Sequence, residues 1–283
     1  MITPDQERYI LDHAYVPEHT VGLMAGVSQG EPFLLDDYLG FKGESWVILV
    51  GYPLAGDFDE EEFGRVVADA MKSFRPVRLW FIAPAIPPAV MHLCQERESD
   101  DYYTLALQPF ELPAPLRRLV HRASRELTLE RGRAMTEAHG KLIAEFLARE
   151  KPGPRIERLF RSMPEYVSRA ETAVVLTAWD RVGEASAFYV VDLDAKYFAT
   201  YVVGCHSKRQ YVVGASDALF HDMIALARGH GKSYIHLGLG VNEGIRRFKE
   251  KWGGVPRLRY EFCEFRPQRP FWSHPFTAGV GPW

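Results

Sequence analysis

The stretch Gly214-Ala-Ser-Asp-Ala-Leu-Phe-His-Asp-Met-Ile-Ala-Leu-Ala-Arg-Gly-His-Gly231 decides the fold, because it joins a glycine-bearing loop to a helix. Ser216 can cap this helix, and a glycine at residue 229 or 231 ends it. The apolar side chains recur at helical spacing, as Leu219, Met223, Ile224 and Ala227. Free backbone N–H groups at a helix start attract anions, and a glycine lets an anion come close. The stretch therefore predicts a helix whose first turn can bind phosphate or pyrophosphate.

Strands are expected on both sides of this helix. One runs from Tyr197 to Gly204 and another from Ser233 to Gly238. A short helix follows over Asn242 to Lys251, and a last strand returns over Pro256 to Phe265. Upstream, residues 172–191 predict two strands joined by a turn. The second part of the chain is thus built of alternating strands and helices.

This order of strand, glycine-bearing loop, helix, strand, short helix and strand resembles the second half of a GNAT acyltransferase. In that family the short helix carries a pattern close to N-x-x-A-x-x-L-Y-x-K-x-G-F. The positions of this chain that correspond to it are Asn242, Ile245, Phe248, Lys251 and Gly253. The resemblance covers residues 172–265 and implies that this region binds an acyl donor.

Two departures from the family pattern favour its Fem-type branch. Lys249 stands where GNAT enzymes frequently have a Tyr acting as general acid, and Tyr211 stands where the phosphate loop usually has a cation or an amide. The runs Gly214-Ala-Ser, Ile235-His-Leu-Gly238 and Phe248-Lys-x-x-Trp-Gly253 are similar to that branch. It includes cell-wall aminoacyl transferases and the soluble domains of lysyl-lipid synthases, which commonly have two GNAT-like halves.

The N-terminal part of the chain also alternates strands with a helix. Pro32 to Leu35, Ser45 to Tyr52 and Val77 to Ile82 read as strands, and Tyr102 to Leu107 offers one more. A helix capped by Asp57 or Asp59 separates two of them. A stretch with three prolines, Gln108 to Pro115, is the best candidate for a domain boundary.

We therefore expect an α/β (α+β) protein of two GNAT-like halves, each a mixed central sheet flanked by helices. The N-terminal, degenerate half comprises residues 1–112, and the donor-binding half comprises residues 113–265. A tail rich in Pro and aromatic residues, 266–283, is expected to pack on the body.

The resemblance implies that two strands separate and that the backbone of one binds the amide chain of the donor. That backbone belongs here to Val202 and Val203, next to Tyr201. The loop and helix starts complete the predicted donor site, which comprises Val202, Val203, Tyr211, Val213, Gly214, Ala215, Ser216 and Asn242. The donor implied is acetyl-CoA or another acyl-CoA.

Three residues are candidates for catalysis. His206 ends a strand and has a side chain whose ordinary pKa lies near neutrality, so it can act as base or remain structural. Cys205 is a candidate nucleophile, and Lys249 can pair with a donor phosphate or an acceptor carboxylate, or extend an exposed charged face. His236 alternates with apolar residues and fits a buried strand better than a catalytic position.

The composition excludes several classes of protein. The chain has 283 residues, a formal net charge of -3 and 47% apolar residues, which does not call for DNA or an anionic membrane as partner. Neither a signal peptide nor an integral membrane segment is evident, and no metal motif is present. The odd count of cysteines, Cys94, Cys205 and Cys263, fits a reducing, cytoplasmic compartment, with each residue a small apolar side chain.

One basic run stands out against the modest net charge, comprising Arg117, Arg118, His121, Arg122, Arg125, Arg131 and Arg133. It is either a solvated helix face or an anchor for phosphate or an anionic partner.

Three functions remain open from the sequence. The first is transfer of an acyl group from an acyl-CoA thioester to the amine of a small molecule, peptide or lipid. The second is a Fem-type transfer from aminoacyl-tRNA, and the third is a non-catalytic GNAT-like binding protein.

Overall fold

The structure is a computed structural model that describes residues 2–108 and 111–267. Its first part has the elements α1 (Pro4–His13), η1 (Pro17–His19), α2 (Val21–Ser28), β1 (Glu31–Leu35), β2 (Tyr38–Lys42), β3 (Trp46–Val50), α3 (Glu60–Phe74), β4 (Arg78–Ala83), α4 (Pro88–Met91) and β5 (Glu96–Ala106). The tail, residues 266–283, was expected to pack on the body. Residues 268–283 of this tail lie outside the described residues.

The second part has the elements α5 (Ala114–Ala123), β6 (Thr128–Gly132), α6 (Glu137–Glu150), α7 (Pro154–Arg169), β7 (Ala173–Trp179), β8 (Ala185–Asp192), β9 (Phe198–His206), α8 (Ala215–Gly229), β10 (Tyr234–Leu239), α9 (Glu243–Lys251) and β11 (Val255–Phe265). No helix within the described ranges is long and apolar enough to cross a membrane.

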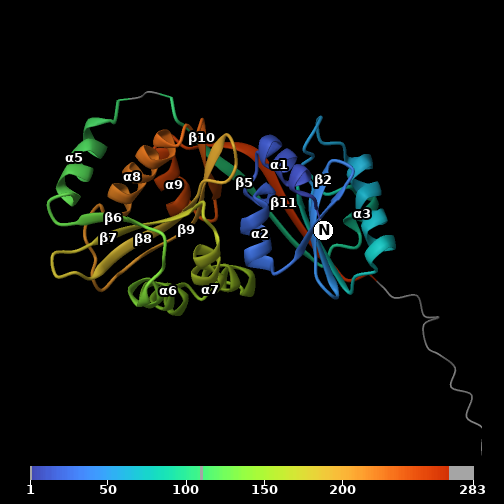
Figure 1. The fold of residues 1–283 in the computed structure, drawn as a ribbon, viewed down its shortest axis with the longest axis horizontal. Coiled ribbons are helices and arrows are strands. Elements are labelled where there is room, and N and C mark those ends of the chain that lie inside the picture. The colour runs from blue at the N-terminus through green and yellow to red at the C-terminus, as the bar shows by residue number, and fades with distance from the viewer. Residues whose placement is uncertain (1, 109–110, 268–283) are drawn as a thin grey trace, which may run out of the picture.

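All strands join one mixed sheet, in the order β1-β2-β3-β4-β11-β5-β10-β9-β8-β7-β6. In the second part, α8 and α9 cover one face of the sheet while α6 and α7 cover the other (Figure 1). Apolar side chains of α8 pack on β7 to β10, and a separate core lies between α6, α7 and β7 to β9. This arrangement confirms the expected α/β class with helices flanking a mixed sheet.

The two parts exchange their last strands. β11 lies between β4 and β5, and β5 lies between β11 and β10, with all three contacts antiparallel. β3 and β4 are parallel with α3 between them in sequence, just as β9 and β10 are parallel with α8 between them. The sheet is therefore continuous across the molecule, and the division near residue 112 remains a prediction.

A disulfide joins the exchanged strand to the first part. Cys94 follows α4, Cys263 lies on β11, and their Sγ atoms are bonded across a separation of 169 residues. The expectation that every cysteine is a separate apolar residue was wrong for these two, because the pairing of β11 with β4 brings together positions that lie far apart in the sequence. Cys205 is a buried free thiol.

The parallel strand pairs of the two parts differ in one respect. β3 and β4 pair over their whole length, from Trp46 opposite Arg78 to Val50 opposite Ile82. β9 and β10 pair only from Phe198 opposite Tyr234 to Thr200 opposite His236. Beyond that point the strands separate, and we call this opening the β9–β10 gap, with its apex at Thr200 and His236.

Candidate functional site

A cavity of about 210 Å³ lies at the start of α8, close to the open end of the β9–β10 gap. Its walls come from β8, β9, the loop before α8, the first turn of α8, and α9. The lining residues are Ser186, His206, Lys208, Tyr211, Val212, Gly214, Ala215, Ser216, Asp217 and Phe248. Five residues of the predicted site, namely His206, Tyr211, Gly214, Ala215 and Ser216, therefore come together here.

Gly214 shapes the start of α8. Its φ is 87°, in the left-handed region that favours glycine, and a Cβ there would lie 3.1 Å from Leu119 Cδ1 of α5. Gly214, and not Ser216, is the N-cap residue, because the helix already begins at Ala215. The predicted cap at Ser216 was wrong by two positions, since only the glycine can make the left-handed turn into the helix.

Backbone donors are available in this first turn. Ala215 N donates to Val212 O and Ala218 N donates to Gly214 O. Within the described ranges, the N–H groups of Ser216 and Asp217 make no hydrogen bond. They lie at the positive end of the helix dipole, where an anion is stabilised.

Asp217 brings a negative charge to the same turn, but its charge is paired. Its Oδ1 lies 2.5 Å from Lys251 Nζ and accepts a hydrogen bond of 2.9 Å from Trp252 Nε1. Both partners belong to the end of α9, so the carboxylate ties α8 to α9. The pairing offsets the repulsion that Asp217 would exert on a bound anion.

A turn anchored by Glu145 presents the basic side of the cavity. Glu145, on α6, accepts hydrogen bonds from Lys208 N at 2.6 Å and Ser207 Oγ at 2.9 Å. The side chain of Lys208 stays near the ring of Tyr211, with Nζ 5.8 Å from the ring centroid. Sequence reasoning missed Lys208 and Glu145, because one is a surface lysine and the other lies on a distant helix.

His206 and Cys205 face different environments. His206 lines the cavity and lies 6.5 Å from the ring of Tyr211, and burial together with the nearby Lys208 lowers its pKa. Cys205 points into the core between the sheet and α6 and α7, where burial raises the pKa of its thiol to about 12. A thiolate is therefore strongly disfavoured at Cys205 near neutral pH.

Val202 and Val203 lie on the open part of β9. Val202 is the extra residue of a β-bulge, because Val203 pairs with Val190 while Tyr201 pairs with Val191. The bulge lies within the gap, and no strand pairs with this segment on the β10 side among the described residues. Its backbone groups are therefore available to a ligand.

Lys249 is a buried residue of α9 and does not line the cavity. Its Nζ donates a hydrogen bond of 2.5 Å to Leu239 O and lies 5.6 Å from the ring centroid of Tyr103. Burial lowers its pKa to about 7, against the smaller opposing influence of Asp100. Lys249 can therefore exchange a proton near neutral pH, unlike a lysine on an exposed helix face.

The remaining predicted donor residues have other surroundings. Asn242 is the N-cap of α9, with its Oδ1 accepting from Ile245 N at 3.0 Å. Val213 is exposed and does not line the cavity. Among the described residues no cluster of His, Cys, Asp or Glu has the arrangement of a metal site.

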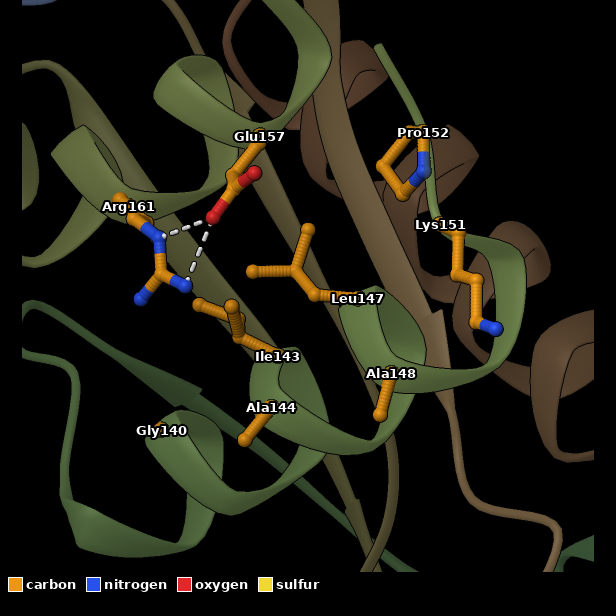
Figure 2. Close-up of a pocket in the computed structure, with 9 residues that line it drawn as sticks. All are labelled: Gly140, Ile143, Ala144, Leu147, Ala148, Lys151, Pro152, Glu157 and Arg161. Carbon is orange, nitrogen blue, oxygen red and sulfur yellow. Dashed lines mark hydrogen bonds and ion pairs between the residues drawn. The ribbon is translucent and has the colours of Figure 1, made fainter. Parts of the chain in front are cut away.

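A second cavity, of about 360 Å³, lies between α6 and α7 (Figure 2). Its walls are largely apolar, with Ile143 and Leu147 pointing into it and an ion pair between Arg161 and Glu157 at its edge (Figure 2). None of the predicted site residues lines it, and the first turn of α7 contributes Glu157, whose carboxylate would repel an anion. The cavity at α8 is therefore the better candidate for a site that binds an anionic donor.

The exchanged halves, the β9–β10 gap and the glycine start of α8 together define a protein with a tandem GNAT-like fold. No protein-family model matches the sequence, and no curated protein matches it. The solved structures that resemble it confirm the predicted likeness to GNAT proteins and to their Fem-like and lysyl-lipid synthase members.

Three of these structures illustrate the likeness. FemX has a TM-score of 0.62 and 11% identity, covering 92% of this chain and 96% of its own. A C-terminal domain named as that of a lysylphosphatidylglycerol synthetase from Agrobacterium fabrum has a TM-score of 0.60 and 17% identity, covering 92% and 90%. L-PGS from Bacillus licheniformis has a TM-score of 0.58 and 18% identity, covering 95% and 93%.

Proposed function

We propose that this chain is an N-acyltransferase that takes its acyl group from a phosphate-bearing donor and transfers it to an amine. The observation that carries the proposal is the β9–β10 gap, which opens from its apex at Thr200 and His236 toward the start of α8. A donor lying along the open edge of β9 would have its phosphate at Gly214 and its acyl end at the apex.

The electrostatics of the cavity support an anionic ligand. The free N–H groups of Ser216 and Asp217 and the ammonium group of Lys208 would contact a phosphate, and the pairing of Asp217 with Lys251 reduces the opposing charge. The equivalent helix of the first part, α3, begins instead with Asp59, Glu60, Glu61 and Glu62. These carboxylates would repel a phosphate, so we assign the donor to the second part alone.

Acetyl-CoA or another acyl-CoA is the donor that we propose first. The cavity is smaller than the roughly 300–1,000 Å³ of sites that enclose a whole small-molecule ligand. It would therefore hold the phosphate portion, while the acyl arm would lie in the gap against the backbone of Val202 and Val203. The amine acceptor, on a small molecule, peptide or lipid, would approach the apex.

A transfer from aminoacyl-tRNA is the second candidate. It is favoured by the likeness to FemX and to the lysylphosphatidylglycerol synthetase domain over nearly the whole chain. An aminoacyl ester also has a phosphate-bearing carrier, so the same gap and helix start would serve it. The two donors differ in the leaving group, a thiolate for the first and a ribose hydroxyl for the second.

Binding of acetyl-CoA can be tested by its effect on the melting temperature. Acetyl-CoA at about 100 times its Kd should stabilise the native state by about 2.7 kcal/mol. The variant Lys208→Ala should bind about fivefold more weakly, the equivalent of ~1 kcal/mol for a lost charged contact. Lys141→Ala, which removes an exposed lysine of α6 outside the cavity, is the matched control and should bind as the wild type does.

The results separate the three functions. Stabilisation by CoA esters that weakens only in Lys208→Ala supports the acyl-CoA donor. Without any stabilisation at a large excess of CoA esters, that donor is excluded, and transfer of a labelled amino acid from aminoacyl-tRNA becomes the decisive measurement. If neither donor acylates any amine in a broad screen, the chain is a GNAT-like binding protein.

A further inference from the structure

A group of buried polar atoms lies at the junction of the two parts, on the sheet face opposite α8. Within the described part of the chain, His236 Nε2 and Thr200 Oγ1 have no hydrogen-bond partner, and Tyr102 Oη and Glu18 Oε2 have none of good geometry. The Tyr102 hydroxyl and the Glu18 carboxyl interact with each other, because, after the larger effect of burial, their hydrogen bond lowers the pKa of Glu18 and raises that of Tyr102. The side chains of Tyr102, His236 and Thr200 are 1%, 0% and 2% exposed. An unpaired polar group in a protein interior costs about 1–3 kcal/mol, so such atoms at one junction call for a function.

These groups form a line that leads to the apex of the β9–β10 gap. Thr200 and His236 are the last paired residues before the strands separate. The ring of Tyr102, on β5, lies 4.8 Å from that of His236 in an edge-on arrangement. Glu18, in η1, is close enough to Tyr102 for its charge to raise the pKa of the phenol, after the larger effect of burial. The line therefore runs from Glu18 through Tyr102 to the apex.

The state of His236 follows from its other nitrogen. Nδ1 accepts a hydrogen bond of 3.2 Å from Gly238 N, and burial lowers the pKa of the ring to about 3. The ring is therefore neutral with its proton on Nε2, an unpaired donor. Since such a ring has no free lone pair, it cannot take up the proton that an amine loses on acylation.

Among the residues that the structure describes, no cation is paired with Glu18. Three tyrosines from different strands and loops surround it, namely Tyr52, Tyr102 and Tyr260. His19 of η1 donates from Nε2 to Tyr52 O, and burial lowers its pKa to about 4, so the ring is neutral. Lys249 acts on His236, and Arg155 acts on Tyr260. Burial raises the pKa of the Glu18 carboxyl to about 7, so it can gain and lose a proton near neutral pH.

We propose that Glu18 accepts the proton that the acceptor amine loses, with the Tyr102 hydroxyl carrying it, so that the first half completes the reaction site that opens in the second. The inference rests on the proposed acyl transfer, because that reaction brings a carbonyl and an amine to the apex. α8 and α9 cover one face of the sheet in the second part (Figure 1). The side chains of Tyr102, His236 and Thr200 belong to the opposite face, because their neighbours Tyr103, Ile235 and Ala199 pack with α8. In this proposal the amine therefore approaches the apex on the face of Tyr102.

The proton and electron balance of the step is simple. The amine lone pair forms the C–N bond, and the leaving thiolate or alkoxide keeps the bonding pair of the broken C–S or C–O bond. The nitrogen proton passes to the Tyr102 oxygen while the Tyr102 proton passes to the Glu18 carboxylate. The leaving group takes a proton from water, and Glu18 returns its proton to solvent as the products leave.

The test is a single-turnover pH–rate profile with acetyl-CoA and a primary amine, measured for the wild type and for Glu18→Gln. The wild-type rate should rise with pH through about 7, because only the carboxylate accepts a proton. Glu18→Gln should lose this rise and slow by on the order of 10²-fold, the usual range for a positioned base, while acetyl-CoA still raises its melting temperature. Asp194→Asn is the matched control, since burial raises the pKa of Asp194 to about 6 away from the gap; it should keep the wild-type profile.

Tyr102→Phe keeps the proposal testable if Glu18→Gln fails to fold. It removes only a hydroxyl, whose interaction is with Glu18, so the fold should persist while the rate falls at least tenfold and the acetyl-CoA stabilisation is retained. If both variants keep the wild-type rate and pH profile while donor binding and transfer remain intact, the proton-accepting role of Glu18 is overturned, but the proposed acyl transfer is not. An absence of donor binding and of transfer in the wild type overturns the acyl transfer itself, and this inference with it.

Discussion

At the scale of single residues, some polar side chains stabilise the fold as helix caps, whereas others are ionisable groups whose burial destabilises it. Asp59 and Asn242 are the N-cap residues of α3 and α9, and their side chains accept hydrogen bonds from backbone N–H groups, as Asp and Asn commonly do at helix starts. Lys249 and Glu18 carry ionisable groups into the interior, where burial moves both pKa values to about 7. A chain keeps such groups at a cost in stability, which is the usual condition of a functional site.

The cost of Glu18 gives a prediction about stability. Its pKa is raised from 4.5 to about 7 in the folded state, so ionisation increasingly favours unfolding as the pH rises between those values. The free energy of unfolding of Glu18→Gln, relative to wild type, should therefore increase by roughly 2–3 kcal/mol from pH 5 to pH 8. Urea unfolding at both pH values measures it, with the exposed Glu44→Gln as the control that shows no such increase. A constant difference for Glu18→Gln would contradict the buried position of the carboxyl.

At the scale of elements, α8 differs from α3 in how it begins. α3 starts with an aspartate cap and a run of glutamates, whereas α8 starts with a left-handed glycine and leaves two N–H groups free. Glu145 of α6 holds the turn of residues 207–210 through hydrogen bonds to Ser207 and Lys208. The proposed anion site is therefore shaped by α6, this turn and the start of α8. The two helices occupy equivalent places in their halves, and in the proposed function the difference between their first turns assigns the donor to the second half.

The glycine at the start of α8 can be tested by Gly214→Ala. A left-handed φ and a Cβ 3.1 Å from Leu119 should lower the free energy of unfolding by about 1–2 kcal/mol and should weaken donor binding. Gly229→Ala, at the end of the same helix, is the control, because a Cβ there meets nothing within 4 Å. Equal stabilities of the two variants in urea unfolding would show that the first turn tolerates a side chain.

At the scale of the whole molecule, the strand exchange makes the two halves dependent on each other. β5 and β11 lie side by side in the middle of the sheet. β11, the last strand of the second part, pairs with β4 of the first part, and β5, the last strand of the first part, pairs with β10 of the second. The junction that this exchange creates holds Tyr102 of β5 and Tyr260 of β11 with ring centroids 5.2 Å apart. The proposed reaction site therefore depends on both halves being folded.

The disulfide between Cys94 and Cys263 should stabilise this exchanged arrangement. Cys94→Ser should lower the free energy of unfolding by about 2–4 kcal/mol, because the unfolded chain regains the freedom of a loop closed over 169 residues. Denaturant unfolding checks the energy, and reduced wild type is the control that should match the variant. Thiol titration of the denatured, unreduced protein should find Cys205 alone; a count of three thiols would disprove the bond.

Much of the fold could be predicted because it is encoded locally. The periodicity of α8, the glycine loop and the short helix with its Asn242 cap each occupy a short window, and the predicted GNAT-like halves with Fem-type character are confirmed. The assignment of Ser216 as cap was wrong, since the choice between Gly214 and Ser216 depends on a left-handed turn that sequence patterns do not resolve. The catalytic assignments of His206, Cys205 and Lys249 stay predictions.

The sequence by itself determined the order of strands and helices over residues 172–265, and it predicted an anion site at the start of α8, whereas α1 and α2 were not predicted. Only the tertiary structure decided that β9 and β10 separate, that Cys94 meets Cys263, and that Glu18 lies beside Tyr102 at the apex. The physical reason is distance along the chain. Helix periodicity and capping act within a few residues, whereas the gap, the disulfide and the junction arise from contacts between segments that only the packing of the exchanged strands brings together.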